Sequence, residues 1–227
     1  MFKGRMFCKR ADLNEEESLT SYLCRISKLN RYVSYSYLVS DLKMTISKFN
    51  NNAFNSHQIN QVGVLVSKPP ELLLKHSNIR IEELTGKDLA DKLLMKNRIK
   101  YCPACLIGNK HHRLSWLLYP LNICTKHKIS LIEKCPRCNS LICLESVLNG
   151  NCKVCNFNLS QANLNRTVPL ETIITPQLYL YNELFNPLRT QCPPLNLCIL
   201  DFLILAESSY YIIEGLKSFL GDEHIIS

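Results

Sequence analysis

The clearest helical pattern in the N-terminal part of the chain covers residues 15–30. Apolar side chains recur there at spacings of three and four residues, while Arg25 and Lys28 fall on the opposite face of the helix. The apolar positions are Leu19, Tyr22, Leu23, Ile26 and Leu29. Asn14 is followed three positions later by Glu17, which is the spacing of a capping box. The pattern predicts an amphipathic helix that begins near Glu15 and ends near Asn30.

Shorter apolar segments after this helix predict further helices. One is expected at residues 36–42, ahead of the polar run at residues 50–52. The next apolar group consists of Ile59, Val62, Leu65 and Val66. Ser67 is expected to cap a new helix, because the prolines at 69 and 70 are tolerated in a first turn. Residues 81–100 mix basic and acidic side chains and predict an exposed, solvated helix that leads to a cysteine-rich region.

A helix, a short break and a second helix have the spacing of a helix-turn-helix motif. Under this hypothesis Lys75, His76, Asn78 and Arg80 form a DNA-facing edge. The alternative is a helical bundle that only resembles the motif, and these residues taken alone favour that alternative.

The C-terminal part, residues 166–227, predicts helices interrupted by proline. Pro187 and the pair Pro193-Pro194 would break any continuous helix. The apolar positions include Leu178, Leu180, Tyr181, Leu184, Phe185, Leu188, Leu197, Leu200, Leu203, Ile204, Tyr210, Ile213, Leu216 and Phe219. These helices are expected to complete the core of the preceding region, and the alternative is that they form a docking surface.

Composition adds limits on location and domain count. The 227 residues suffice for one large domain or two small ones, and 46% apolar and 20% charged residues are ordinary for a folded chain. The first ten residues lack the apolar segment of a signal peptide. Residues 195–206 contain Asp201 and fall short of the roughly 20 apolar residues that span a bilayer. A cytoplasmic protein without a membrane segment is expected.

The net charge of +8 is unevenly distributed. Residues 1–100 carry +7, residues 101–165 carry +5 and residues 166–227 carry −4. A basic surface suits a polyanionic partner, although a charge of this size is also compatible with solubility alone. If the protein contacts nucleic acid, the first two segments are favoured for that contact, while the acidic tail suits packing or a protein partner. Thiolate ligands of bound zinc would lower the positive charge of the middle segment.

Four close pairs of metal-binding residues follow one another in the middle segment, and each pair is separated by two residues. They are Cys102 and Cys105, Cys124 and His127, Cys135 and Cys138, and Cys152 and Cys155. This spacing allows a tight turn to direct two ligands at one tetrahedral ion. In a reducing compartment, such pairs indicate metal binding more than disulfides. Thiolate and imidazole ligands select Zn²⁺, and four protein ligands leave no position for a reactive water.

In chain order, the first site is a Cys₃His set (Cys102, Cys105, Cys124 and His127) and the second a Cys₄ set (Cys135, Cys138, Cys152 and Cys155). The alternative is the interleaved pairing of RING-type ubiquitin ligases, but there only two or three residues separate the His from the next Cys, against seven here. Consecutive sites, with two structural Zn²⁺ ions, are therefore favoured. A chelator is expected to unfold residues 101–160 and to spare the N-terminal helices.

Other cysteines and histidines are predicted to have no role in metal binding. Cys143 lacks a close partner, as do Cys8, Cys24, Cys192 and Cys198, and a lone cysteine is usually a small buried apolar residue. His111-His112 are expected to lie in an exposed loop. Trp116, the single tryptophan, is expected to pack under the first site.

The order of these features resembles the TniQ family of transposition targeting proteins. That family combines an opening E-S-L-x-S-[WY]-L helix with C-P-x-C, R-x-x-W, C-x-x-H and a further C-P-x-C. The corresponding residues are Glu17-Ser18-Leu19-Thr20-Ser21-Tyr22-Leu23-Cys24-Arg25-Ile26, Cys102-Pro103-Ala104-Cys105-Leu106, Arg113-Leu114-Ser115-Trp116, Cys124 to His127, Leu131, and Cys135-Pro136-Arg137-Cys138. The resemblance covers roughly residues 15–160, and the tail from Arg166 is only loosely constrained by it.

The resemblance implies an N-terminal helix-turn-helix domain joined to tandem zinc ribbons, without catalytic activity. Members of the family select insertion sites for transposons related to the TnsABC systems, and they help to recruit the AAA+ ATPase TnsC to target DNA. Larger, TnsD-like members bind an attachment sequence directly. Shorter members, in CRISPR-associated transposons, attach to an RNA-guided effector complex. At 227 residues this chain is similar to the shorter kind.

The expected fold is therefore mainly α with small zinc-ribbon β elements: a helical domain (1–100), a tandem zinc-ribbon module (101–165) and a helical C-terminal segment (166–227). The expected function is that of a bacterial, cytoplasmic, non-enzymatic adaptor. It would connect a CRISPR effector complex or its guide RNA to TnsC on DNA, through mostly backbone contacts, with a homodimer as a further option. The alternative is a TnsD-like factor that binds a specific DNA site. The sequence contains neither G-x-x-x-x-G-K-[ST] nor H-E-x-x-H, and this disfavours an enzyme.

Overall fold

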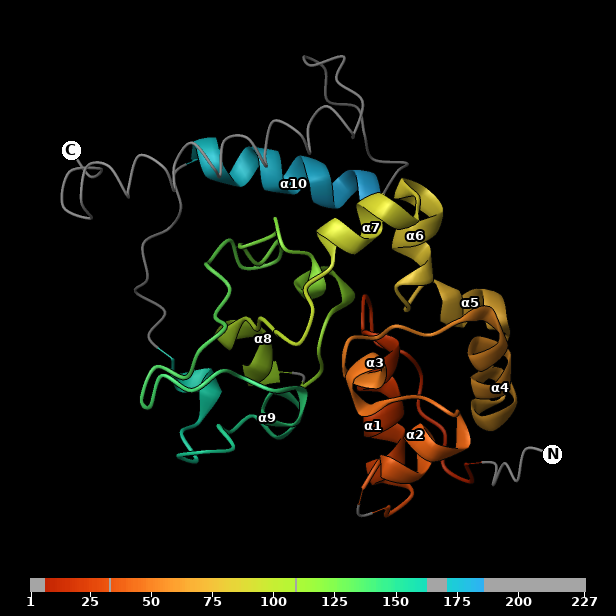
Figure 1. Ribbon diagram of the computed structural model, residues 1–227. Helices are drawn as coiled ribbons and strands as arrows, with labels where there is room; N and C mark the ends of the chain where they lie inside the picture. The colour runs from red at the N-terminus through yellow and green to blue at the C-terminus, as the bar shows by residue number, and fades with distance from the viewer. Residues whose placement is uncertain (1–6, 33, 109, 163–170, 186–227) are drawn as a thin grey trace.

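The computed structural model describes residues 7–32, 34–108, 110–162 and 171–185, and in these residues the chain is mainly helical, as predicted (Figure 1). The helices are α1 (Leu19–Leu29), α2 (Ser36–Asp41), α3 (Ile46–Asn50), α4 (Ser56–Val66), α5 (Pro70–Leu74), α6 (Ile79–Thr85), α7 (Lys87–Leu93), α8 (Pro103–Gly108), α9 (Leu144–Asn149) and α10 (Glu171–Phe185), with short 3-10 helices η1 (Leu114–Leu117) and η2 (Leu159–Gln161). The β pairings of the described residues are isolated bridges.

Helix α1 begins at Leu19, four residues later than the capping-box spacing predicts. Ser18 is its N-cap, and the Ser18 side chain accepts a hydrogen bond from the backbone N–H of Ser21. Glu16 has a φ of 57°, a left-handed conformation that cannot start a right-handed helix. Glu17 does accept a hydrogen bond from the Asn14 backbone at 3.1 Å, but this contact closes a turn ahead of the helix. The predicted end of the helix near Asn30 is confirmed.

The helices that follow α1 agree only partly with the prediction. Helix α2 lies where a helix was expected, whereas α3 was not anticipated. Ser67 does not cap α5, and this prediction is wrong. With a φ of 50°, Ser67 instead ends α4 in a left-handed turn, and α5 begins at Pro70 after an extended Pro69. The prolines therefore act as expected at the start of a helix.

The single exposed helix predicted for residues 81–100 is also wrong. Gly86, with a φ of 79°, separates α6 from α7, and the chain leaves the helical conformation at Leu94. A residue with a side chain would be strained at this φ, so Gly86 suits the break. Lys100, expected among the solvated charges, is buried.

The buried side chains form two cores that cross the predicted domain boundaries. The first core joins α1, α2 and α4 to the cysteine-rich region, including Cys102, Cys124, Cys135 and Trp116. The second joins α6, α7 and residues 114–121 to α10, which lies beside α6 and α7 in Figure 1. The division at residue 100 stays a prediction, but the apolar contacts on both sides of this position form one continuous cluster.

Helix α10 contains the first part of the predicted C-terminal helices. Leu180, Tyr181, Leu184 and Phe185 face the second core, so this segment completes a core formed by α6, α7 and η1 rather than one around the cysteine pairs. The predicted helical positions from Leu188 onward, with Cys192 and Cys198, lie outside the described residues. None of the helices in the described part of the chain has the length and apolar character required to cross a membrane.

Candidate metal centres

The structure brings the eight predicted ligand side chains together as two separate sets of four, in chain order. Cys102, Cys105, Cys124 and His127 form the first set, and Cys135, Cys138, Cys152 and Cys155 form the second. Within each set the four ligand atoms lie within 4.8 Å of one another. The interleaved pairing is not the arrangement found among the described residues.

The distances in the first set match the edges of a zinc tetrahedron. The Nδ1 atom of His127 lies 3.4, 3.3 and 3.6 Å from the sulfurs of Cys102, Cys105 and Cys124, and the Cys105 and Cys124 sulfurs are 3.7 Å apart. Zn–S bonds of about 2.3 Å and Zn–N bonds of about 2.0 Å give edges of roughly 3.5 Å between S and N and roughly 3.8 Å between sulfurs. The set therefore has the size that Zn²⁺ requires.

The second set has the same dimensions. The sulfurs of Cys135 and Cys155 lie 3.6 Å apart, and those of Cys138 and Cys152 lie 3.7 Å apart. Cys143 stays outside this set, as predicted, and its sulfur lies 3.3 Å from the Ser146 hydroxyl.

Three of the four ligand pairs are held by one repeated backbone turn. The N–H of the first ligand bonds to the carbonyl five residues later, and its own carbonyl accepts from the N–H four residues later. Distances for these bonds lie between 2.7 and 2.9 Å in the turns that start at Cys124, Cys135 and Cys152. The residue after the second ligand has a φ of 53–56° in each turn, and these residues are Lys128, Asn139 and Asn156. An isolated bridge closes each turn: Ile123 with Ser130, Lys134 with Leu141, and Asn151 with Asn158.

The thiols of the first set cannot all ionise without a cation. Hydrogen bonds with the sulfurs of Cys105 and Cys124 raise the pKa of Cys102, whereas the hydrogen bonds that Cys124 accepts from the other two thiols lower the pKa of Cys124. The Cys124 thiolate thus accepts hydrogen bonds from the two neighbouring thiols, which keep their protons. A divalent cation would replace these protons, and the donor set of three sulfurs and one imidazole fits zinc.

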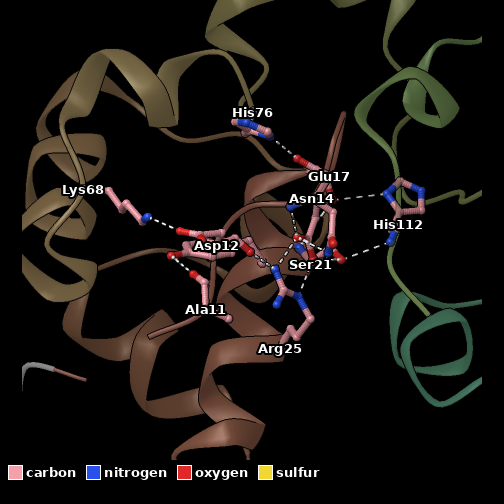
Figure 2. Close-up of polar contacts among 11 residues, drawn as sticks. Ala11, Asp12, Asn14, Glu17, Ser21, Arg25, Lys68, His76 and His112 are labelled. Carbon is pink, nitrogen blue, oxygen red and sulfur yellow. Dashed lines mark hydrogen bonds and ion pairs between the residues drawn. The ribbon is translucent and has the colours of Figure 1, made fainter. Parts of the chain in front are cut away.

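A buried carboxylate ties the start of α1 to its surroundings (Figure 2). Glu17 is fully buried, and its oxygens accept from the Arg25 guanidinium at 2.7 and 3.1 Å, from the Asn14 amide and from the Ser21 hydroxyl. Ser21 in turn accepts from the backbone N–H of His112 at 3.0 Å. The residues that carry the family resemblance at the N-terminus therefore hold α1 against the cysteine-rich region.

Glu16 also connects the start of α1 to the cysteine-rich region. Its carboxylate lies 3.5 Å from the Arg113 guanidinium and accepts hydrogen bonds from Ser115 and from the Tyr181 hydroxyl of α10. Residues far apart in the sequence thus meet at one side chain. Trp116 is buried in the first core, as expected, with its ring edge-on to His112 at 5.6 Å between centroids.

The prediction that His111 and His112 lie in an exposed loop is wrong. Both are buried, and burial lowers the pKa of His112 to about 3, so its ring stays neutral. Its Nδ1 lies 3.3 Å from the Ser18 hydroxyl, and its carbonyl accepts from the Ser18 N–H at 2.8 Å. A sequence cannot reveal this burial, because it results from the packing of α1 onto the loop.

The four residues predicted to face DNA occupy different environments. The Lys75 side chain is exposed. The His76 ring instead bonds the Glu17 carbonyl at 2.6 Å, and buried Asn78 donates to the Asn51 carbonyl at 2.8 Å. Arg80 donates to the carbonyls of Leu184 and Phe185 at the end of α10. Contact of these residues with nucleic acid stays a prediction, and three of them already bond within the protein.

Lys100 is a structural residue that sequence reasoning missed. Its ammonium group donates to the carbonyls of Leu118, Tyr119 and Leu121 at 2.5–3.2 Å and to the Asn122 side chain at 3.2 Å. Burial lowers the pKa of Lys100 to about 7, while the four oxygens favour its charged form. Its position two residues before Cys102, inside a run of exposed charges, gave no local signal of this role.

Comparison with known proteins supplies the identity of this architecture. A search of curated protein sequences finds no match to the chain. The model of the TniQ family matches residues 10–131, which include α1, the buried junction and all four residues of the first ligand set. Because this match covers more than half of the 227 residues, the chain belongs to the TniQ family.

Proposed function

We propose that this protein is a non-enzymatic adaptor that directs transposon insertion by joining a target-selection complex to the ATPase TnsC on target DNA. The match of the TniQ family model to residues 10–131 carries this proposal, because the family is one of transposition targeting proteins without catalytic activity. The proposed target-selection complex is an RNA-guided CRISPR effector. The two four-ligand sets support the non-catalytic part, because protein side chains supply every position of each tetrahedron.

Each ligand set is proposed to bind one structural Zn²⁺ ion, so that the cysteine-rich region works as tandem zinc ribbons. The matching edge lengths and the repeated turns around the ligand pairs support this assignment. Elemental analysis of the purified protein should find two zinc ions per chain, and one or none would contradict the assignment.

The N-terminal helices are proposed to place the adaptor on DNA in the manner of a helix-turn-helix domain. Lys28 on α1 supports a phosphate contact, as do Lys9, Arg31 and Lys110 outside the helices, because all four are exposed and, among the described residues, none has a carboxylate partner. Lys28 and Lys110 meet at Asn149, where their ammonium groups donate to its side-chain and backbone oxygens at 2.6 and 3.3 Å. Such cations contact the backbone of nucleic acid without reading its sequence.

The adaptor proposal is tested with purified protein, TnsC and the RNA-guided effector of the same transposon system. The chain should join the two partners in one complex that survives nuclease treatment, and its affinity for DNA alone should depend on salt but not on sequence. Reversing the charge of Lys28 and Lys110 should reduce the slope of affinity against salt by about 1 for each lost phosphate contact. Lys87→Glu, at an exposed position of α7 outside the Lys28–Lys110 pair, is the matched control.

A footprint at one defined DNA sequence, given by the purified chain alone, would contradict the adaptor proposal and favour a TnsD-like factor. The internal hydrogen bonds of His76, Asn78 and Arg80 argue against such direct recognition, because these side chains would have to exchange protein partners for DNA.

A further inference from the structure

The two ligand sets differ in how well the protein shields their sulfurs. In the first set, the three cysteines are buried, with 0%, 9% and 1% of their surface exposed for Cys102, Cys105 and Cys124. In the second set Cys135 and Cys152 are buried, but Cys138 is exposed and Cys155 is half-buried. A reagent in solution can therefore reach a sulfur of the second set directly, whereas the sulfurs of the first set lie under protein.

A hydroxyl group lies next to the exposed sulfur. The Oγ atom of Ser140 is 3.1 Å from the Cys138 sulfur and 3.5 Å from the Cys152 sulfur. When these cysteines are thiolates they have no proton to donate, so the Ser140 hydroxyl donates and the nearer sulfur accepts. A hydrogen bond to a metal-bound thiolate withdraws electron density from the sulfur and makes it a weaker nucleophile. Ser140 thus moderates the reactivity of Cys138, the exposed cysteine of the second set.

We propose that Cys138 is a site of reversible oxidation by hydroperoxides, and that its oxidation releases the metal ion of the second set while the first set keeps its ion. This inference rests on the proposal that the second set binds zinc. It adds a modification site to a region whose proposed role is structural.

The reaction consumes one hydroperoxide and two thiolates. The Cys138 sulfur attacks an oxygen of the peroxide, the O–O bond breaks, and with one proton the departing oxygen becomes water (or an alcohol) and Cys138 a sulfenic acid. The Cys152 sulfur, 3.7 Å away, then attacks the Cys138 sulfur, and the S–O bond breaks. The departing hydroxide takes up a second proton. Two electrons pass from the thiolates to the peroxide, and Zn²⁺ leaves because only two thiolates remain.

Release of this ion would act on the contact between the second set and α1. In the sequence, helix α9 comes between Cys138 and Cys152. Its residues Leu144 and Val147 are buried in the first core with α1. The Lys28 ammonium on α1 also bonds the Asn149 side chain at the end of α9. A thiol reductant together with Zn²⁺ would restore the closed set, so the change is reversible.

The test treats the purified protein, first shown to contain two zinc ions, with hydrogen peroxide and follows the metal with a colorimetric zinc chelator. One equivalent of zinc should appear first, and the second only much later. Trypsin cleaves after Arg137 and Lys153, so one peptide carries Cys138, Cys143 and Cys152. In the Cys143→Ser variant this peptide should lose the mass of two hydrogens as the first zinc leaves, which assigns the disulfide to Cys138 and Cys152.

Two variants make the assignment falsifiable without removing a ligand. Ser140→Ala keeps all four sulfurs and should release the first zinc severalfold faster, because the Cys138 sulfur loses its hydrogen bond. Cys143→Ser, which removes a thiol outside the set, should leave the rate unchanged. Equal rates of zinc loss from both sets, earlier oxidation of Cys105 or Cys124, or an unchanged rate in Ser140→Ala would each overturn the proposal.

Discussion

At the scale of a single residue, the contacts of Glu17 determine how the chain enters helix α1. A buried carboxylate is costly unless charged and polar partners surround it, and here Arg25, Asn14 and Ser21 supply them. Partners before and within α1 thus converge on one side chain, which sets the direction in which the chain enters the helix.

Glu17→Gln should lower the free energy of unfolding by about 2 kcal/mol, because the Arg25 guanidinium loses its charged partner and one oxygen acceptor becomes a donor. Urea denaturation followed by the fluorescence of Trp116 measures this loss. Glu15→Gln, at the neighbouring exposed position, is the matched control and should change stability by less than about 0.5 kcal/mol. Equal effects of the two substitutions would show that the Glu17 contacts do not contribute to stability.

At this scale the sequence predicts which side chains the structure gathers into the two four-residue sets, but it does not predict the surroundings of these sets. The four close pairs could be recognised because the ligand chemistry and the turn both require a fixed local spacing. Lys100, His111 and His112 carry no such local requirement. Their burial depends on residues distant in the sequence, such as Leu118 for Lys100 and Ser18 for His112, and no pattern around them indicates it.

At the scale of elements, the repeated turn around the ligand pairs requires a particular kind of residue at one position. It requires a left-handed residue directly after the second ligand, and Asn139 with a φ of 56° fills this position in the third pair. Asparagine and glycine tolerate this conformation, whereas a β-branched residue is strained there.

Asn139→Val should therefore weaken zinc binding by the second set, with a cost of about 1–2 kcal/mol, while Asn139→Gly should be nearly neutral. Competition for zinc against a chelator of known affinity measures the difference. The exposed Asn139 side chain makes no hydrogen bond among the described residues, so the comparison isolates the backbone. Equal affinities for the two variants would contradict the role assigned to the left-handed position.

The errors in predicting elements have physical causes. Periodicity located α1, because apolar positions alone decide which face of a helix is buried, but the capping-box spacing of Asn14 and Glu17 placed its start too early, since the N-cap is Ser18. The left-handed Glu16 excludes the earlier start. In residues 81–100, the sequence did not reveal the helix break at Gly86, because an isolated glycine within a helical pattern is often tolerated.

At the scale of the whole molecule, the two cores cross the boundary expected at residue 100. The first core places α1 and α4 in the same cluster as the cysteines of both ligand sets. Small metal-binding modules bury little apolar surface, so bound zinc supplies much of their folding energy. We therefore expect metal bound by the two ligand sets to stabilise the N-terminal helices as well, through the shared apolar contacts.

Removing both metal ions should consequently loosen α1 as well as the cysteine-rich region, in contrast to the expectation from sequence that a chelator spares the N-terminal helices. Hydrogen exchange measured by mass spectrometry after chelation should show lower protection for residues 19–29. The peptide that covers α7, in the second core, serves as the internal reference and should change less. Undiminished protection of α1 would mean that the helical part folds independently.

The placement of Lys100 has a practical consequence for work on this protein. Its amine is enclosed by carbonyl oxygens, so reagents that acylate surface lysines should leave it unlabelled while the native structure persists. Because Lys100 lies two residues before Cys102, labelling at this position would give a chemical read-out of whether the protein around the first ligand pair is intact.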